Sequence, residues 1–118
     1  MNDFNVKFGI IGIDHRHVYT QAQFLVELGA ELAGWYTEGS PNTLAGFTKR
    51  FPKAKRFTDP RSLLEDPNIQ VILTSAIPSE RAKISIAAMN HGKDVMSDKP
   101  GCLSFSDLEE LRQTVQQT

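Results

Sequence analysis

The chain has 118 residues, of which 40% are hydrophobic and 23% are charged, and these proportions are typical of one globular domain. A formal net charge of -1 gives no electrostatic reason to bind nucleic acid or an anionic membrane. The sequence contains no apolar run of the ~20 residues that cross a bilayer. A single cysteine, Cys102, cannot form an internal disulfide, and we therefore expect a reducing, cytoplasmic location.

Strand and helix patterns alternate along the chain. Apolar or β-branched runs predict five strands, at residues 6–11, 31–36, 55–57, 69–74 and 94–96. Helical spacing, together with starting and terminating residues, predicts helices at 18–28, 41–51, 60–64 and 78–91, and a last helix capped by Ser104 or Ser106. This order predicts an α/β fold over residues 1–118: a Rossmann-like, doubly wound parallel sheet within one three-layer domain.

The first loop of such a fold follows the strand that ends at Ile11. Ligands of parallel sheets bind at the carboxyl ends of the strands, and dinucleotides need a glycine-rich turn there. Gly12 supplies the first glycine of the G-x-G-x-x-G pattern, whereas Asp14 and His17 occupy the positions of the other two. The loop therefore permits two interpretations, a divergent dinucleotide turn or an ordinary turn in which Asp14 caps the next helix.

The same loop raises the question of a metal site. Asp14, His15 and His17 bring a carboxylate and two imidazoles into one short segment. No third histidine lies nearby in the sequence, and His91 falls at a helix end away from the ligand side. We therefore expect no metal here. Instead, His15 or His17 lies beside a cofactor, contacts the substrate, or acts as a polar cap residue.

Two further loops contain candidate cofactor contacts. Glu38 follows the second strand, where an acidic residue holds the adenosine ribose hydroxyls and favours NAD over NADP; the alternative is a solvated surface glutamate. Ser75, Ala76 and Ile77 follow the fourth strand, where small residues let the chain pass close to a planar ligand. Arg81, one turn into the next helix, faces either a phosphate or substrate, or the solvent.

The last loop contains a candidate proton-transfer residue. Pro100 disfavours helical backbone at Lys99, which places Lys99 at the carboxyl edge of the sheet. A lysine in this position can stabilise an alkoxide or act as a general acid or base, and Asp98 can pair with it or with a cofactor hydroxyl. The alternative is an ordinary surface lysine.

Several segments resemble one family in order and spacing. Residues 9–12 resemble its opening strand and turn, and residues 63–72 resemble its LL-x-DP-x-hydrophobic-D-x-V stretch. Residues 87–95 resemble its A-x-x-A-G-K-H-V stretch, and Asp98-Lys99-Pro100 resembles its E-K-P motif. Together these segments are similar to the N-terminal NAD(P)-binding domain of the glucose–fructose oxidoreductase, inositol dehydrogenase and MocA family, usually written Gfo/Idh/MocA.

This resemblance implies an oxidoreductase that transfers a hydride between nicotinamide and a sugar, an inositol or a related polyol. The implied cofactor is NAD, with NADP as the alternative. Lys99 would be the catalytic residue that assists proton transfer. The implied cofactor contacts are Gly12, Ile13, Asp14, His15, Glu38, Ser75, Ala76, Ile77, Asp98 and Pro100.

The chain also departs from the family pattern. Asp14 replaces the second fingerprint glycine, Arg81 falls where a histidine is common, and Asp98 replaces the motif glutamate. Family members continue into a sixth strand and a second domain that holds the substrate and the oligomer interface, so we expect a homo-oligomer in the full-length protein. Since this chain ends at Thr118, we expect that its last strand and substrate domain are absent and that it is inactive alone. The competing hypotheses are a non-catalytic nucleotide-binding or sensor module and a purely structural interaction domain.

Overall fold

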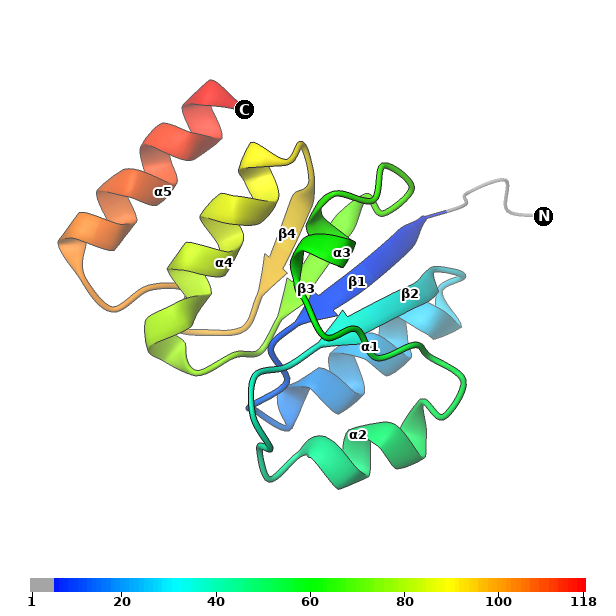
Figure 1. Cartoon of the computed structure of the whole chain (residues 1–118). Coiled ribbons are helices and arrows are strands. Elements are labelled where there is room, and N and C mark those ends of the chain that lie inside the picture. The colour runs from blue at the N-terminus through cyan, green and yellow to red at the C-terminus, as the bar shows by residue number, and fades with distance from the viewer. Residues whose placement is uncertain (1–5) are drawn as a thin grey trace.

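The computed structural model describes residues 6–118 and shows a parallel sheet with helices on both faces (Figure 1). The sheet has the strand order β2-β1-β3-β4, with β1 (Lys7–Ile11), β2 (Glu31–Tyr36), β3 (Val71–Thr74) and β4 (Asp94–Ser97). The helices are α1 (His17–Glu27), α2 (Leu44–Arg50), α3 (Arg61–Leu64), α4 (Pro78–Asn90) and α5 (Phe105–Gln117). The α/β, Rossmann-like fold class predicted from the alternating pattern is therefore confirmed.

The strand expected at residues 55–57 does not form. This segment forms only an isolated bridge, in which Arg56 lies beside Trp35 of β2. Two hydrogen bonds form this bridge, one from the Trp35 N–H to the Lys55 carbonyl (3.0 Å) and one from the Phe57 N–H to the Trp35 carbonyl (2.8 Å). A turn precedes the segment, and Pro60 at the start of α3 follows shortly after it, so the extended stretch is too short to become a strand.

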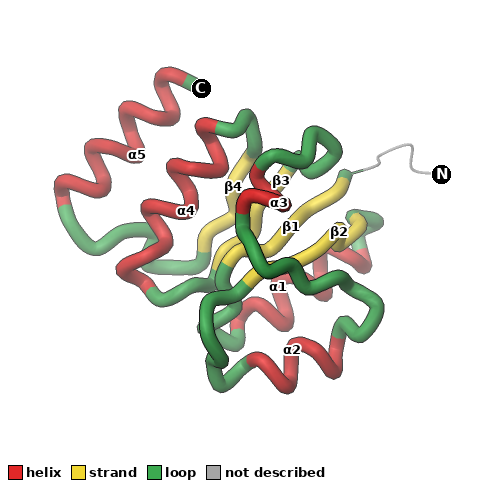
Figure 2. Tube along the Cα trace, viewed as in Figure 1, coloured by secondary structure: helices red, strands yellow, loops and turns green. Residues whose placement is uncertain are grey.

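Two apolar clusters lie on opposite faces of the sheet. On one face, α1 and α2 pack over a cluster that consists of Phe8, Ile10, Ile13, Val18, Ala22, Trp35, Phe47 and Leu73 (Figure 2). On the other face, α3 and α4 cover Ile11, Leu63, Leu64, Ile69, Ile72 and Ala88, and α5 packs against α4. Since β1 and β3 lie in the middle of the sheet, their side chains enter both clusters, which explains their apolar composition.

The helix starts differ in how the sequence specifies them. Pro78 is the first residue of α4, where its missing N–H would have had no intrahelical partner. The interpretation that Asp14 caps the first helix is wrong, because the N-cap of α1 is Arg16.

Within residues 6–118, no helix combines the length and apolarity that a bilayer-spanning helix needs.

Candidate functional site

The strand order changes direction between β1 and β3. From β1 the chain crosses to β2 on one side, and it later returns to β3 on the other side. The loops that leave β1 and β3 are tied together, because the Ser75 N–H donates to the Gly12 carbonyl and the His15 N–H donates to the Ser75 carbonyl, both at 2.9 Å. A crevice at such a change of direction is the usual ligand site of an open α/β sheet.

Gly12 is required by the geometry of the first loop. Its φ of 91° lies in the left-handed region that residues with a Cβ rarely adopt. A Cβ placed on Gly12 would lie 2.4 Å from the Cβ of Ala76. The glycine therefore allows both the sharp turn after β1 and the close approach of the loop that follows β3.

A cavity of about 630 Å³ opens beside this contact. Five of the predicted cofactor residues line it, namely Gly12, Asp14, Glu38, Ala76 and Ile77. The cavity walls also include Ile11, Tyr36, Pro60, Leu64, Glu80, Lys83, Ile84 and Ala87. Mostly apolar walls with a few convergent polar groups are typical of small-molecule and cofactor sites.

Two predicted cofactor residues direct their side chains into the protein. Ile13 is fully buried in the cluster beneath α1, and its N–H donates to the Thr37 hydroxyl at 3.4 Å. The Ser75 hydroxyl donates to the amide oxygen of Gln21 at 3.1 Å. These two residues shape the crevice through their backbones.

The N-terminus of α1 retains free donors. Among the residues that the structure describes, the N–H groups of Asp14 and Arg16 have no acceptor, whereas the Gly12 N–H donates to the Tyr36 carbonyl at 2.8 Å. Unbonded N–H groups at a helix N-terminus attract anions such as a pyrophosphate. The residues present therefore fit a dinucleotide, with fewer free donors than a fully glycine-rich turn would offer.

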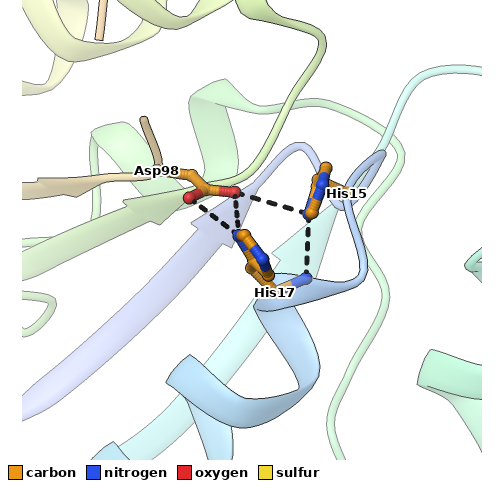
Figure 3. Close-up of side chains that lie close together, drawn as sticks. All are labelled: His15, His17 and Asp98. Carbon is orange, nitrogen blue, oxygen red and sulfur yellow. Dashed lines mark hydrogen bonds and ion pairs between the residues drawn. The ribbon is translucent and has the colours of Figure 1, made fainter. Parts of the chain in front are cut away.

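Three polar side chains from distant parts of the sequence converge at the same edge of the sheet (Figure 3). His17 Nδ1 lies 3.2 Å from both carboxylate oxygens of Asp98, and His15 Nδ1 lies 3.6 Å from Asp98 Oδ2. The side chain of Asp98 is 4% exposed, whereas those of His15 and His17 are 46% and 50% exposed. The carboxylate thus forms the base of a small polar cluster, and the imidazoles form its solvent-facing side.

The Asp98 carboxylate is held in its ionised form. Burial by itself would raise its pKa, but hydrogen bonds from His17 and from the Lys99 N–H (2.9 Å) lower it. The Arg81 guanidinium, with Nη2 at 3.9 Å from Asp98 Oδ2, contributes in the same direction, and the pKa of Asp98 lies below its usual value.

Arg81 has a structural position that the sequence analysis did not anticipate. Its side chain is almost fully buried, so neither the solvent-facing alternative nor an open contact with a phosphate describes it. Its Nε donates to the Ala76 carbonyl and its Nη1 to the Lys99 carbonyl, both at 2.7 Å. Arg81 therefore ties the loop after β3 to the loop after β4.

Lys99 and Pro100 follow β4 at this edge, and both are exposed. Asp98 accepts a hydrogen bond from the Lys99 backbone N–H, as expected of neighbours in a tight turn. The Lys99 side chain is therefore open to solvent at this edge of the sheet.

The profile of a family described as "Oxidoreductase family, NAD-binding Rossmann fold" matches residues 6–118. This chain belongs to the Gfo/Idh/MocA oxidoreductases. The resemblance seen in the sequence motifs is thereby confirmed, and the domain is the NAD(P)-binding part of such an oxidoreductase.

Similar proteins include both named enzymes and solved structures. Myo-inositol 2-dehydrogenase of Thermotoga maritima is 30% identical over 57 residues, which cover 48% of this chain and 17% of the enzyme. The 1-carboxy-3-chloro-3,4-dihydroxycyclohexa-1,5-diene dehydrogenase of Comamonas testosteroni is 24% identical over 102 residues, 86% of this chain and 25% of the enzyme. A crystal structure from Erwinia carotovora atroseptica, assigned as an oxidoreductase, is 33% identical with a TM-score of 0.91, and the match covers 96% of this chain and 34% of that one.

The same fold occurs in a reductase whose structure contains biliverdin rather than a sugar or polyol. Biliverdin reductase of Synechocystis, solved with biliverdin and NADP+, matches with a TM-score of 0.78 at 24% identity. The match covers 95% of this chain and 35% of the reductase. This Gfo/Idh/MocA chain therefore spans about a third of the length of these solved structures and a quarter or less of the curated relatives.

Several site residues of this Gfo/Idh/MocA domain escaped the sequence analysis. Glu80, Lys83, Ile84 and Ala87 line the cavity from α4, and their spacing of three, one and three residues is that of a single helix face. This periodicity is visible in the sequence and could have revealed them. The clustering of His15 and His17 with Asp98 left no comparable signal.

Proposed function

We propose that this domain binds NAD for an oxidoreductase that transfers a hydride between nicotinamide and a hydroxyl-bearing carbon of a sugar, an inositol or a related polyol. The observation that carries the proposal is the cavity at the change of strand direction, lined by both Gly12 and Glu38. The printed names of two relatives, an inositol dehydrogenase and a dehydrogenase of a dihydroxylated ring, support a polyhydroxylated substrate.

The lining of the cavity supports a preference for NAD. Glu38 lies on its wall, where a carboxylate can accept hydrogen bonds from the ribose hydroxyls and repel a 2′-phosphate. Gly12 and Asp14, whose N–H group is free, line it just before the start of α1, where they can bind the pyrophosphate. When bound, the cofactor supplies the hydride chemistry, and the protein supplies its position.

Proton transfer is assigned to Lys99. Its ammonium is exposed at the carboxyl edge of the sheet, next to a buried carboxylate that fixes the Lys99 backbone through its N–H. From this position Lys99 can donate a proton to, or accept one from, the substrate oxygen as the hydride moves. This chain matches only 34% of the solved oxidoreductase from Erwinia carotovora atroseptica, and we expect further groups that hold the substrate in the unmatched part.

A non-catalytic nucleotide-binding module is the second candidate. It is favoured by the first loop, in which the N–H groups of Gly12, Ile13, His15 and His17 already donate within the protein. A loop with so few free donors would bind a dinucleotide weakly.

The experiment has a binding part and a turnover part. In the first, the chain is titrated with NADH and with NADPH, and Glu38→Ala is compared with Glu110→Ala, which removes an exposed carboxylate on α5. We expect weak binding that prefers NADH. A hydrogen bond to a charged group is worth about 1.5–3 kcal/mol, so Glu38→Ala should weaken NADH binding about tenfold or more and remove the preference, whereas Glu110→Ala should change neither.

In the second part, Lys99→Ala is introduced into a chain that carries a substrate domain. Lost turnover with retained NADH affinity supports the enzyme. NADH binding that the substitution leaves unchanged, with no turnover in either chain, supports the binding module. A chain that binds neither nucleotide at millimolar concentration would overturn the proposal.

A further inference from the structure

We propose that His15, His17 and Asp98 form a binding site for one divalent transition-metal ion, of which Zn²⁺ is the best match. The nitrogen and oxygen atoms that they can offer all lie within 4.8 Å of one another. Figure 3 shows the three side chains turned toward a common point, with His15 beside the carboxylate and His17 below it. This inference goes beyond the proposed function, since it requires neither a nucleotide nor a substrate.

The spacing of the three groups is close to that of a tetrahedral metal site. With metal–ligand bonds of about 2.0–2.1 Å, two ligands of a tetrahedral Zn²⁺ lie roughly 3.3 Å apart. His17 Nδ1 lies 3.2 Å from the Asp98 oxygens, and His15 Nδ1 lies 3.6 Å from Asp98 Oδ2. These two separations match a tetrahedral site, and the three groups all lie within 4.8 Å of one another, so rotation of the two exposed imidazoles would be enough to close the site around an ion.

The hydrogen bonds around His15 favour a cation at this point. The backbone N–H of His17 donates to His15 Nδ1 at 3.1 Å, so this nitrogen carries a lone pair and no proton. The same nitrogen faces the Asp98 carboxylate, which also offers only lone pairs. Two acceptors face each other there, and a metal ion between them would convert this unfavourable contact into two coordinate bonds. Metal binding would break the bond from the His17 N–H and the His17–Asp98 hydrogen bond, and the proton on His17 Nδ1 would move to Nε2 or to solvent.

The surroundings determine the class of ion. Asp98 is fixed by the Lys99 N–H at 2.9 Å and lies 3.9 Å from Arg81 Nη2, an outer layer of the kind that orients metal ligands. With a single carboxylate, the site offers too few oxygen ligands for Mg²⁺ or Ca²⁺, ions that prefer several. Two imidazoles and one carboxylate suit Zn²⁺ and its neighbours, including Co²⁺ and Ni²⁺.

Because the two imidazoles are exposed, an ion bound between them would be accessible to solvent on one side. The His15 and His17 side chains are about half exposed, so an ion can enter from solvent, while the carboxylate beneath them is buried. Three protein ligands with a fourth position open to water or a substrate oxygen are the pattern of catalytic zinc sites. The sequence alone argues against a metal because no third histidine lies near the loop, but the fold supplies a third ligand, Asp98, just after β4.

Metal titration of the untagged protein tests the proposal. After treatment with a chelator, the protein is titrated with Zn²⁺ by calorimetry and with Co²⁺ by visible absorption, whose intensity distinguishes tetrahedral from octahedral coordination. We expect one ion per chain and an intense, tetrahedral-type Co²⁺ spectrum. No saturable binding below millimolar metal would overturn the proposal.

Matched histidine variants locate the site. We expect His15→Gln and His17→Gln each to weaken Zn²⁺ binding by at least about tenfold. His91→Gln is the control, since His91 lies at the end of α4 and its Nδ1 contacts the Ala87 carbonyl at 2.7 Å. Because both variants of the first loop replace half-exposed side chains, they should fold normally, which circular dichroism checks. Unchanged affinity in both variants, or loss of binding in His91→Gln, would refute the assignment.

Discussion

At the scale of single residues, Lys93 shows how a buried charge is accommodated. Only 6% of Lys93 is exposed, and its ammonium donates to the carbonyls of Asp66 and Ile69, both at 2.7 Å. Burial lowers the pKa of Lys93, and the nearby Asp66 carboxylate partly opposes this shift. The lysine thus fastens the turn between α4 and β4 to the segment that leads into β3.

We predict that Lys93→Met destabilises the domain. Methionine fills a similar volume but leaves the carbonyls of Asp66 and Ile69 without their donor, and an unsatisfied buried group costs about 1–3 kcal/mol. The free energy of unfolding, measured with urea, should fall by roughly that amount, while the exposed control Lys49→Met should stay within about 0.5 kcal/mol of the wild type. Equal or higher stability of Lys93→Met would mean that the cost of burying the ammonium exceeds the value of its hydrogen bonds.

At the scale of elements, α5 illustrates how one residue determines where a helix begins. Ser104 has an extended backbone, with φ of -142° and ψ of 156°, and its hydroxyl accepts a hydrogen bond from the Asp107 N–H at 3.1 Å. Ser106, the other candidate cap in the sequence, lies inside the first turn. Capping is decided by backbone conformation, and both serines satisfy the sequence pattern equally well.

Separate alanine substitutions at Ser104 and Ser106 distinguish the capping residue from a residue inside the helix. Ser104→Ala should lower the free energy of unfolding by about 1 kcal/mol, because the Asp107 N–H loses its acceptor. Ser106→Ala should be neutral or slightly stabilising, since alanine is the better helix former. Thermal denaturation followed by circular dichroism measures both, and a larger loss for Ser106→Ala would contradict the assigned cap.

At the scale of the whole molecule, stability depends on two apolar clusters separated by the sheet. Phe47 is fully buried in the cluster beneath α1 and α2, where its ring contacts Trp35 edge-on with centroids 4.8 Å apart and Phe51 at 4.9 Å. This aromatic group joins α2 to β2 across the outer part of the sheet. A small domain divides its buried area between two such clusters, so loss of one anchor affects the whole fold.

We predict that Phe47→Ala costs about 3–5 kcal/mol of stability, the usual loss when a buried aromatic side chain is truncated. The control is Phe105→Ala at the start of α5, where the phenylalanine is 89% exposed, and it should leave the free energy of unfolding nearly unchanged. Urea denaturation provides both values. Similar losses in the two variants would show that the cluster around Phe47 contributes less than its burial implies.

The sequence by itself determined the fold class and the order of elements. Runs such as Val71–Thr74 and helical spacing depend on neighbouring residues, so their periodicity is readable without a structure. The loops that follow parallel strands meet at one edge of the sheet, so the strand order alone pointed to Gly12 and Glu38 as residues of the cavity. The expected strand at residues 55–57 forms only a bridge to Trp35, because the turn before it and Pro60 after it leave too short an extended stretch.

Only the tertiary structure decided how distant side chains meet. Arg81 became a buried link between two loops, and Asp98 joined His17 across 81 positions of the sequence. Such contacts arise when crossovers bring the ends of β1, β3 and β4 together, and no periodicity in the chain records which side chains then face one another. The sequence therefore identified the edge of the sheet that carries the chemistry, and the packing of its loops decided which groups converge there.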